Sequence, residues 1–139
     1  MNASTRLLTA LLVFLPTIGF SQQTISEYDK ELSDGRLLGA ASYVNAARAS
    51  ECGYLFIDHE LDVGTAILKI RQKRSAERRK VLDKYLLSTN FKEQLQETNE
   101  IVLTAIKVLK RRNDQKTACL LLRDTLIQPI LKTSTDTWR

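Results

Sequence analysis

The feature that most constrains the fold is the spacing of apolar residues beyond the first 21 positions. Apolar residues recur every three or four positions over long stretches, and Pro129 is the one proline in this part of the chain. This spacing is typical of amphipathic helices, whereas half-buried strands need alternating apolar and polar residues. The sequence therefore predicts an all-α fold.

Four helices are predicted, over residues 34–59, 63–87, 90–112 and 115–131. Asn90 followed by Glu93 resembles a capping box for the third helix, and the pair Asn113 and Asp114 is a stop-and-cap signal before the fourth. The third and fourth helices are apolar around more than half of their circumference, which predicts that they form the centre of the fold. Because short connections favour antiparallel neighbours, we expect a small four-helix bundle or an orthogonal helical array.

The N-terminus has the pattern of an export signal. Arg6 supplies positive charge, residues 7–18 are apolar, and the small residues Gly19 and Ser21 precede a cleavage site after position 21. The apolar run is shorter than the roughly 20 residues of a spanning helix, and Pro16 interrupts it. We therefore predict a signal peptide at 1–21, a polar segment at 22–33 and a helical domain at 34–139, with no membrane span after cleavage.

Cys52 and Cys119 are the only two cysteines in the chain. In an oxidising compartment an even number of cysteines indicates a disulfide, and their spacing and number exclude CxxC redox and zinc arrangements. The only Asn-x-Ser/Thr triplet begins at Asn2, inside the predicted signal, so a bacterial periplasm is favoured over a eukaryotic secretory route. We expect a periplasmic or secreted protein in which Cys52 on the first helix is joined to Cys119 on the fourth.

The stretch RQKRSAERRK, residues 71–80, is strongly basic, and only Glu77 opposes its six cations. At 100° per residue, Arg74 and Arg78 fall on the same side of a continuous second helix as its apolar residues. An unpaired buried charge costs several kcal/mol, so the residues leave three solutions open. The helix breaks at Ser75 with Glu77 in the first turn of a new helix, the segment projects beyond the core, or acidic side chains meet the arginines.

An antiparallel hairpin of the second and third helices, centred on Thr89, predicts which residues come level. Arg78 lies level with Glu100, and Glu93, Glu97 and Glu100 share one edge of the third helix. Farther from the turn, the same alignment brings basic residues of the second helix level with basic residues of the third. The predicted binding surface consists of the eight residues Lys69, Arg71, Lys73, Arg74, Lys107, Lys110, Arg111 and Arg112.

Two explanations of that surface remain open from the sequence. Residues 22–62 contain eight acidic and three basic residues, whereas residues 63–139 contain eight acidic and 17 basic ones. The surface is therefore either covered by Asp58, Glu60 and Asp62 or open to an acidic partner.

The sequence carries little that indicates catalysis or a cofactor. His59 is the only histidine, and residues 58–69 depart from a calcium loop because Gly64 comes one position late and Lys69 takes the place of the final glutamate. No nucleotide-binding or hydrolase motif occurs, and the basic stretch contains no aromatic residue on which nucleic-acid bases could stack. We expect no metal, no cofactor and no nucleic acid.

These features favour an exported, non-enzymatic helical module that binds another protein, as an inhibitor, an immunity protein or a chaperone does. The alternative is a binder of an anionic cell-envelope polymer through the basic surface, and a third candidate is a hydrolase with a carboxylate pair, which has no linear signature. Binding that survives high salt favours an acidic protein partner, whereas binding abolished by salt favours the polymer.

Overall fold

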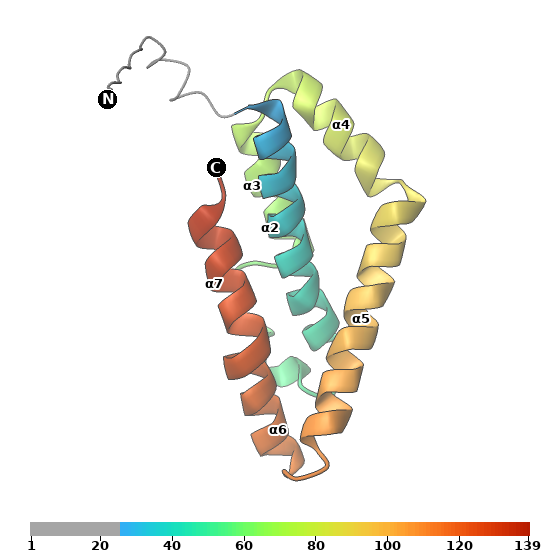
Figure 1. Cartoon of the computed structure of the whole chain (residues 1–139), viewed down its shortest axis with the longest axis vertical. Coiled ribbons are helices and arrows are strands. Elements are labelled where there is room, and N and C mark those ends of the chain that lie inside the picture. The colour runs from blue at the N-terminus through green and yellow to red at the C-terminus, as the bar shows by residue number, and fades with distance from the viewer. Residues whose placement is uncertain (1–25) are drawn as a thin grey trace, which may run out of the picture. The chain divides into compact units, whose positions relative to one another are not determined.

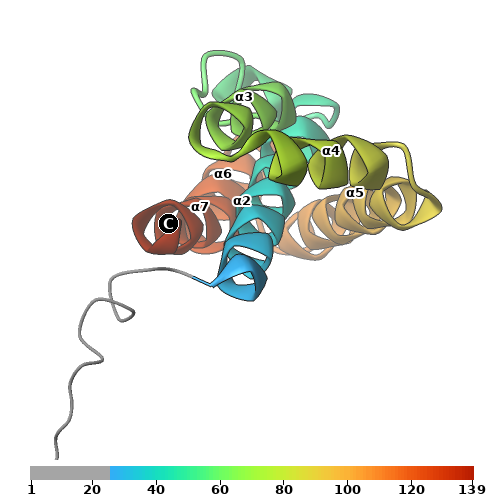
Figure 2. The same cartoon turned by 90° about the horizontal axis from the view of Figure 1, so that it is seen from above.

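The computed structural model describes residues 26–139, and every regular element in that range is a helix (Figures 1 and 2), so the all-α prediction is confirmed. The predicted signal peptide, residues 1–21, lies outside the described range. Within residues 26–139, every helix falls short of the length or apolar content that crossing a membrane requires. The elements in chain order are α2 (Glu27–Arg48), the 3-10 helix η1 (Gly53–Leu55), α3 (Val63–Lys73), α4 (Ala76–Leu86), α5 (Thr89–Leu109), α6 (Gln115–Leu121), the π-helical segment η2 (Leu122–Ile127) and α7 (Gln128–Thr137).

Helix α2 begins and ends earlier than the predicted helix at 34–59. The hydroxyl of Ser26 accepts a hydrogen bond from the backbone N–H of Asp29 at 3.1 Å, and Lys30 forms an ion pair with Glu27 at 3.1 Å. A hydroxyl before the first turn and acidic residues within it are favourable at a helix N-terminus. The helix then ends at Arg48, and turns lead into η1.

Residues 33–138 pack as one compact unit, and the described residues before Ser33 fall outside it. Within this unit α2 lies between α7 and α5 (Figures 1 and 2). Its buried residues, many of them small enough for a neighbouring helix to approach closely, are Ser33, Asp34, Leu37, Leu38, Ala40, Ala41, Ser42, Val44, Ala46 and Ala47. The buried residues of α5 are Phe91, Thr98, Val102 and Ile106. The prediction that the third and fourth helices form the centre is therefore wrong, because α2 occupies it.

The predicted disulfide between Cys52 and Cys119 is present, with the two Cα atoms 5.2 Å apart and both residues fully buried. Cys119 lies on α6, but Cys52 lies in the turn after α2 rather than on the first helix. Gly53 is required beside it, because a Cβ at this position would clash with the carbonyl oxygen of Arg48. The bridge therefore fixes a tight turn, not a helix, to helix α6.

The predicted second helix is broken within the basic stretch. Helix α3 ends at Lys73, Arg74 is extended, and Ser75 caps α4 by accepting a hydrogen bond from the backbone N–H of Arg78 at 3.3 Å. Glu77 lies in the first turn of α4, where a negative charge opposes the positive end of the helix dipole. The helix break at Ser75, the first of the three solutions that the sequence left open, is therefore present.

The two cap predictions for the later helices have different outcomes. Asp114 caps α6 as predicted, and its carboxylate accepts a hydrogen bond from the backbone N–H of Thr117 at 2.8 Å. The cap of α5 is Ser88 rather than Asn90, and its hydroxyl accepts from the backbone N–H of Phe91 at 3.2 Å. Both serine and asparagine favour this position, and the extended backbone of Ser88 decides between them.

Helices α6 and α7 are joined without interruption by the π-helical segment η2. The backbone N–H of Gln128 donates to the carbonyl of Arg123, five residues earlier. In a regular helix the ring of Pro129 would clash with the carbonyl of Thr125, and the wider π turn moves that carbonyl aside. The helix consequently continues to Thr137 instead of ending near residue 131.

The π turn also changes which residues face inward. The regular pattern predicts Ala118, Leu121, Leu122, Thr125 and Leu126 as the buried side of the fourth helix. The residues that are buried are Ala118, Cys119, Leu122, Ile127 and Leu131. The extra residue in the turn shifts the inward face by one position after Leu122, so Ile127 replaces Leu126 in the core.

Candidate functional site

Arg74, in the middle of the basic stretch, is buried and paired with an acid on α2. Its guanidinium donates two hydrogen bonds to the carboxylate of Asp34, at 2.7 and 3.0 Å. The Arg74 side chain is 3% exposed and that of Asp34 is 10% exposed. Two parallel bonds of this kind are the strongest geometry an arginine can form with a carboxylate. The third solution that the sequence left open, an acidic partner for the arginine, is therefore present together with the helix break.

Trp138 completes this arrangement from the C-terminal end of α7. Its indole N–H donates to the carboxylate of Asp34 at 2.9 Å. The ammonium of Lys73 lies 4.9 Å from the ring centroid and the guanidinium carbon of Arg74 lies 5.5 Å from it, both within cation–π range. We call Asp34, Arg74 and Trp138 the buried charge cluster, because they join α2, the α3–α4 junction and α7.

Other cations of the basic stretch have local partners. Arg71 forms an ion pair with Asp83 on α4. Arg79 donates to the backbone carbonyls of Arg71 and Arg74, at 3.4 and 2.9 Å, and so satisfies acceptors at the C-terminal end of α3. The density of positive charge in RQKRSAERRK therefore has a structural role at the helix junction.

The predicted convergence of two basic sets does not occur. In Figure 1 the C-terminal end of α3 and the C-terminal end of α5 lie at opposite ends of the compact unit. The break after Arg74 is the physical reason, because α4 turns away from the direction of α3 before the chain enters α5 (Figures 1 and 2). Lys69, Arg71, Lys73 and Arg74 are thus brought together at the α3 end, and Lys107, Lys110, Arg111 and Arg112 are brought together at the α5 end.

The α5 end is the more open of the two. Lys110 forms an ion pair with Glu51 at 2.8 Å. Lys107, Arg111 and Arg112 are exposed, and the described part of the chain offers them no ion-pair partner. Neither half is covered by Asp58, Glu60 and Asp62 in the way considered above, because these acids form no ion pair with any of the eight basic residues.

Helix α5 carries exposed apolar side chains on both sides of a row of charged residues. Ile101, Leu103 and Val108 are 45%, 57% and 48% exposed. The α5 outer face, as we define it, also contains Glu93, Glu97, Glu100, Thr104 and Lys107, which recur at spacings of four and three, together with Arg111 in the turn after the helix. The charge along this face therefore changes from acidic to basic in the direction of the chain. At 100° per residue, Ile101 and Val108 flank this charged row on one side and Leu103 flanks it on the other.

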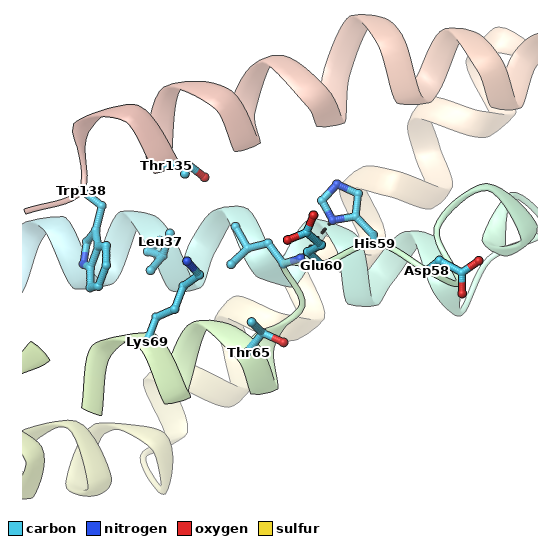
Figure 3. Close-up of a pocket in the computed structure, with 9 residues that line it drawn as sticks. Leu37, Asp58, His59, Glu60, Thr65, Lys69, Thr135 and Trp138 are labelled. Carbon is cyan, nitrogen blue, oxygen red and sulfur yellow. Dashed lines mark hydrogen bonds between the residues drawn. The ribbon is translucent and has the colours of Figure 1, made fainter. Parts of the chain in front are cut away.

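A separate cleft lies between α2, α3, α7 and the connection before α3 (Figure 3), with a volume of about 430 Å³. We call it the Trp138 cleft. Its lining combines apolar and aromatic walls with charged and hydroxyl groups, and consists of Leu37, Asp58, His59, Glu60, Leu61, Thr65, Lys69, Thr135 and Trp138. Among the residues that the structure describes, no cluster of three metal-ligating side chains occurs there or elsewhere.

Arg48 fixes the connection that carries His59 and Glu60 into this cleft. Its guanidinium donates to the backbone carbonyls of Phe56 and His59, each at 2.8 Å, and to the carboxylate of Asp62 at 2.7 Å. The Nδ1 atom of His59 accepts from the backbone N–H of Leu61 at 3.1 Å, which leaves Nε2 as the proton-bearing nitrogen of the neutral ring. The connection is therefore held in one conformation although it contains no regular helix.

Asp62 has a strongly lowered pKa, of about 2. The largest cause is the hydrogen bond from the backbone N–H of Thr65, at 2.8 Å, and the second is the hydrogen bond from Arg48. Both bonds stabilise the carboxylate form. Asp62 is thus a structural anion that caps α3 and holds Arg48, and its bonds leave Glu60 as the acid that turns toward the cleft.

Sequence reasoning identified the basic stretch but missed both of its distant partners. Asp34 is 40 positions from Arg74, and Trp138 is 104 positions from Asp34. The signal that could have found Asp34 is its place three and four residues before Leu37 and Leu38, on the inward side of the first helix. The only tryptophan of the chain, close to its C-terminus, gave no such positional signal.

No protein-family model matches the chain, and neither the curated proteins nor the solved structures contain a significantly similar one. Two surfaces of the described residues are candidates for binding, the α5 outer face and the Trp138 cleft. The first has exposed apolar groups and unpaired charges, which is the composition of a protein interface. The second is concave and polar at its ends, which is the composition of a small-ligand site.

Proposed function

We propose that the protein is an exported, non-enzymatic module that binds another protein through the α5 outer face. The observation that carries the proposal is the exposure of Ile101, Leu103 and Val108 on a helix whose opposite side is well packed. Exposed aliphatic side chains that flank a row of charged residues on a small protein are typical of interaction sites.

The charge order of the face defines the partner's chemistry. Lys107, Arg111 and Arg112 call for acidic groups on the partner, whereas Glu93 and Glu97 call for basic ones. A partner helix that runs antiparallel to α5 and has the same acidic-to-basic order meets both requirements. An inhibitor, an immunity protein or a chaperone-like binder would use such a face against its target.

The apolar part of the face supports a modest affinity by itself. Burying a whole aliphatic side chain contributes about 1.5–3 kcal/mol, and three half-exposed side chains therefore contribute roughly 2–4 kcal/mol together. A micromolar complex needs about 8 kcal/mol. The charged residues, or contacts outside α5, must supply the rest, so both the apolar and the charged parts of the face need testing.

A cross-linking experiment in an exporting host tests the proposal. A photoreactive amino acid replaces Ile101 or, as the control, Lys80, which is exposed on α4. The identified partner is then purified, and its affinity is measured for the double variant Ile101→Ser with Val108→Ser. The matched control is Leu68→Ser, because Leu68 is 59% exposed on α3, away from the face.

We expect the α5 variant to bind at least about tenfold more weakly and Leu68→Ser to bind normally, since only the first removes buried apolar contacts. Equal affinity of both variants would refute the role of the face. Sedimentation of the purified protein shows whether the partner is a second copy, because the charge order of α5 is complementary to itself in an antiparallel pair.

The alternative, an anionic cell-envelope polymer, is favoured by one specific observation. Lys107, Arg111 and Arg112 have no ion-pair partner in residues 26–139 and gather at one end of α5. Binding to a polymer through these cations falls steeply as salt rises and does not depend on Ile101 or Val108. Binding that persists at 0.5 M salt and is lost in the apolar variant favours the protein partner.

A further inference from the structure

The Trp138 cleft has charges of opposite sign at separate points along its length. Figure 3 shows the ammonium of Lys69 beside Leu37 and the carboxylate of Glu60 farther along, beside His59. The carboxylate of Asp58 turns away from both. One end of the cleft is therefore suited to an anion and the other to a cation.

Neither of these charges is used inside the described chain. Among residues 26–139, Lys69 and Glu60 have no ion-pair or hydrogen-bond partner for their side chains, whereas nearby Asp62 is bound by Arg48. Surface charges without partners are common, but these two line the same concavity of about 430 Å³. That volume lies within the range of small-molecule sites, about 300–1,000 Å³.

The space between the two charges is apolar. Leu37, Leu61 and the indole ring of Trp138 line it, and the Trp138 N–H is turned to Asp34 and away from the cleft. The hydroxyls of Thr65 and Thr135 lie on opposite walls, on α3 and α7, where they can bind polar backbone groups of a ligand. The cleft thus matches a ligand with two opposite end charges, an apolar side chain and internal amide groups.

We propose that the Trp138 cleft binds a short, free peptide with apolar side chains. Its C-terminal carboxylate lies at Lys69, and its N-terminal ammonium lies at Glu60. The side chains pack mainly on the partly exposed indole ring of Trp138, above a floor formed by Leu37 and Leu61, and replace water at this apolar wall. The cleft and the α5 outer face share no residue, so this proposal is independent of the protein-binding function.

Trp138 makes the test direct, because it is the only tryptophan and lines the cleft. Its fluorescence is recorded while the dipeptide Leu-Leu or the tripeptide Leu-Gly-Leu is added to the full protein. Amide NMR spectra recorded in parallel report binding that leaves the emission unchanged. We expect a saturable change with at least one of the two peptides below about 10 mM, within the range of affinities that small ligands reach in such clefts.

Blocked peptides and cleft variants separate the two end contacts. N-acetylation removes the ammonium and C-amidation removes the carboxylate, and each is expected to weaken binding about tenfold, as the loss of a charge-assisted bond does. Glu60→Gln is expected to abolish the effect of N-acetylation, and Lys69→Met that of C-amidation. Both residues are exposed, so the fold tolerates these changes, and Lys116→Met on α6 is the matched control.

The outcomes are decisive in both directions. Weaker binding in the two cleft variants, with normal binding in Lys116→Met, supports the proposal. Equal affinity for free and blocked peptides would overturn it, because the end charges would then have no role. The absence of a saturable change with both peptides, by fluorescence and by NMR, would overturn it as well.

Discussion

Replacing Asp34 by alanine is expected to cause one of the largest losses of stability that a single substitution in this chain can produce. The change leaves the Arg74 guanidinium, with a side chain only 3% exposed, without its two hydrogen bonds. Removing one partner of a buried ion pair costs about 3–5 kcal/mol, because the remaining charge stays away from water. Trp138 also loses its acceptor. Alanine is the better helix former, so helix propensity partly offsets the loss and cannot explain it.

The basic stretch offers a matched control, the pair of Arg71 and Asp83. These side chains are 40% and 52% exposed, and an ion pair in such a setting contributes about 0–1 kcal/mol. Asp83→Ala is therefore expected to change the free energy of unfolding by less than about 1 kcal/mol. The comparison uses the same residue types and a cation from the same ten-residue stretch, so it isolates the effect of burial.

Denaturant unfolding followed by circular dichroism, with the disulfide intact, measures both variants. A whole domain is usually stable by about 5–15 kcal/mol, so a loss of 3–5 kcal/mol moves the midpoint clearly. The double variant Asp34→Leu with Arg74→Met is expected to recover much of the loss, because it removes both charges. Equal stability of Asp34→Ala and Asp83→Ala would refute the argument.

Three further expectations concern other parts of the chain. Replacing Cys52 and Cys119 by alanine should lower the unfolding free energy by roughly 4 kcal/mol, the chain-entropy value for a separation of 67 residues, and denatured, unreduced wild type should titrate no thiol. The pKa of Asp62 is lowered to about 2 by a backbone N–H of α3 and by Arg48, so its stabilisation is complete above about pH 4 and is lost as the pH falls toward 2. Asp62→Asn should thus be less stable than wild type by about 1–2 kcal/mol at pH 6, and the gap should narrow on acidification. The intact mass of the exported protein should correspond to a chain that begins at Gln22, and a retained apolar segment would contradict the predicted cleavage.

Local signals in the sequence predicted the features that depend on neighbouring residues. The helical class follows from apolar spacing, and the cap at Asp114 follows from its side chain. The conflict between Arg74 and an apolar stripe left the break at Ser75 as one of three open solutions. The disulfide follows from the count of cysteines. These features need no knowledge of how distant parts of the chain pack.

The features that were missed depend on distant contacts or on backbone details. Asp34 lies 40 residues before Arg74. The acids first considered as partners of Arg74 were those of residues 58–62, which are closer to it in the sequence. The π turn before Pro129 shifts the inward face by one residue, which a regular period of 3.6 cannot predict. The break at Ser75 was considered, but the alignment of α3 with α5 assumed an unbroken helix.

The basic stretch shows why a count of charges did not locate a binding surface. Arg74 is buried against Asp34, Arg71 is paired with Asp83, and Arg79 satisfies carbonyls at the end of α3. Each cation is held by a group that the linear pattern did not place beside it, so the density of charge at this junction stabilises the turn between two helices. Lys107, Arg111 and Arg112, which have no ion-pair partner in residues 26–139, lie instead at the C-terminal end of α5. Apolar side chains are also exposed on this helix, and that combination, rather than charge alone, directs the proposed function to α5.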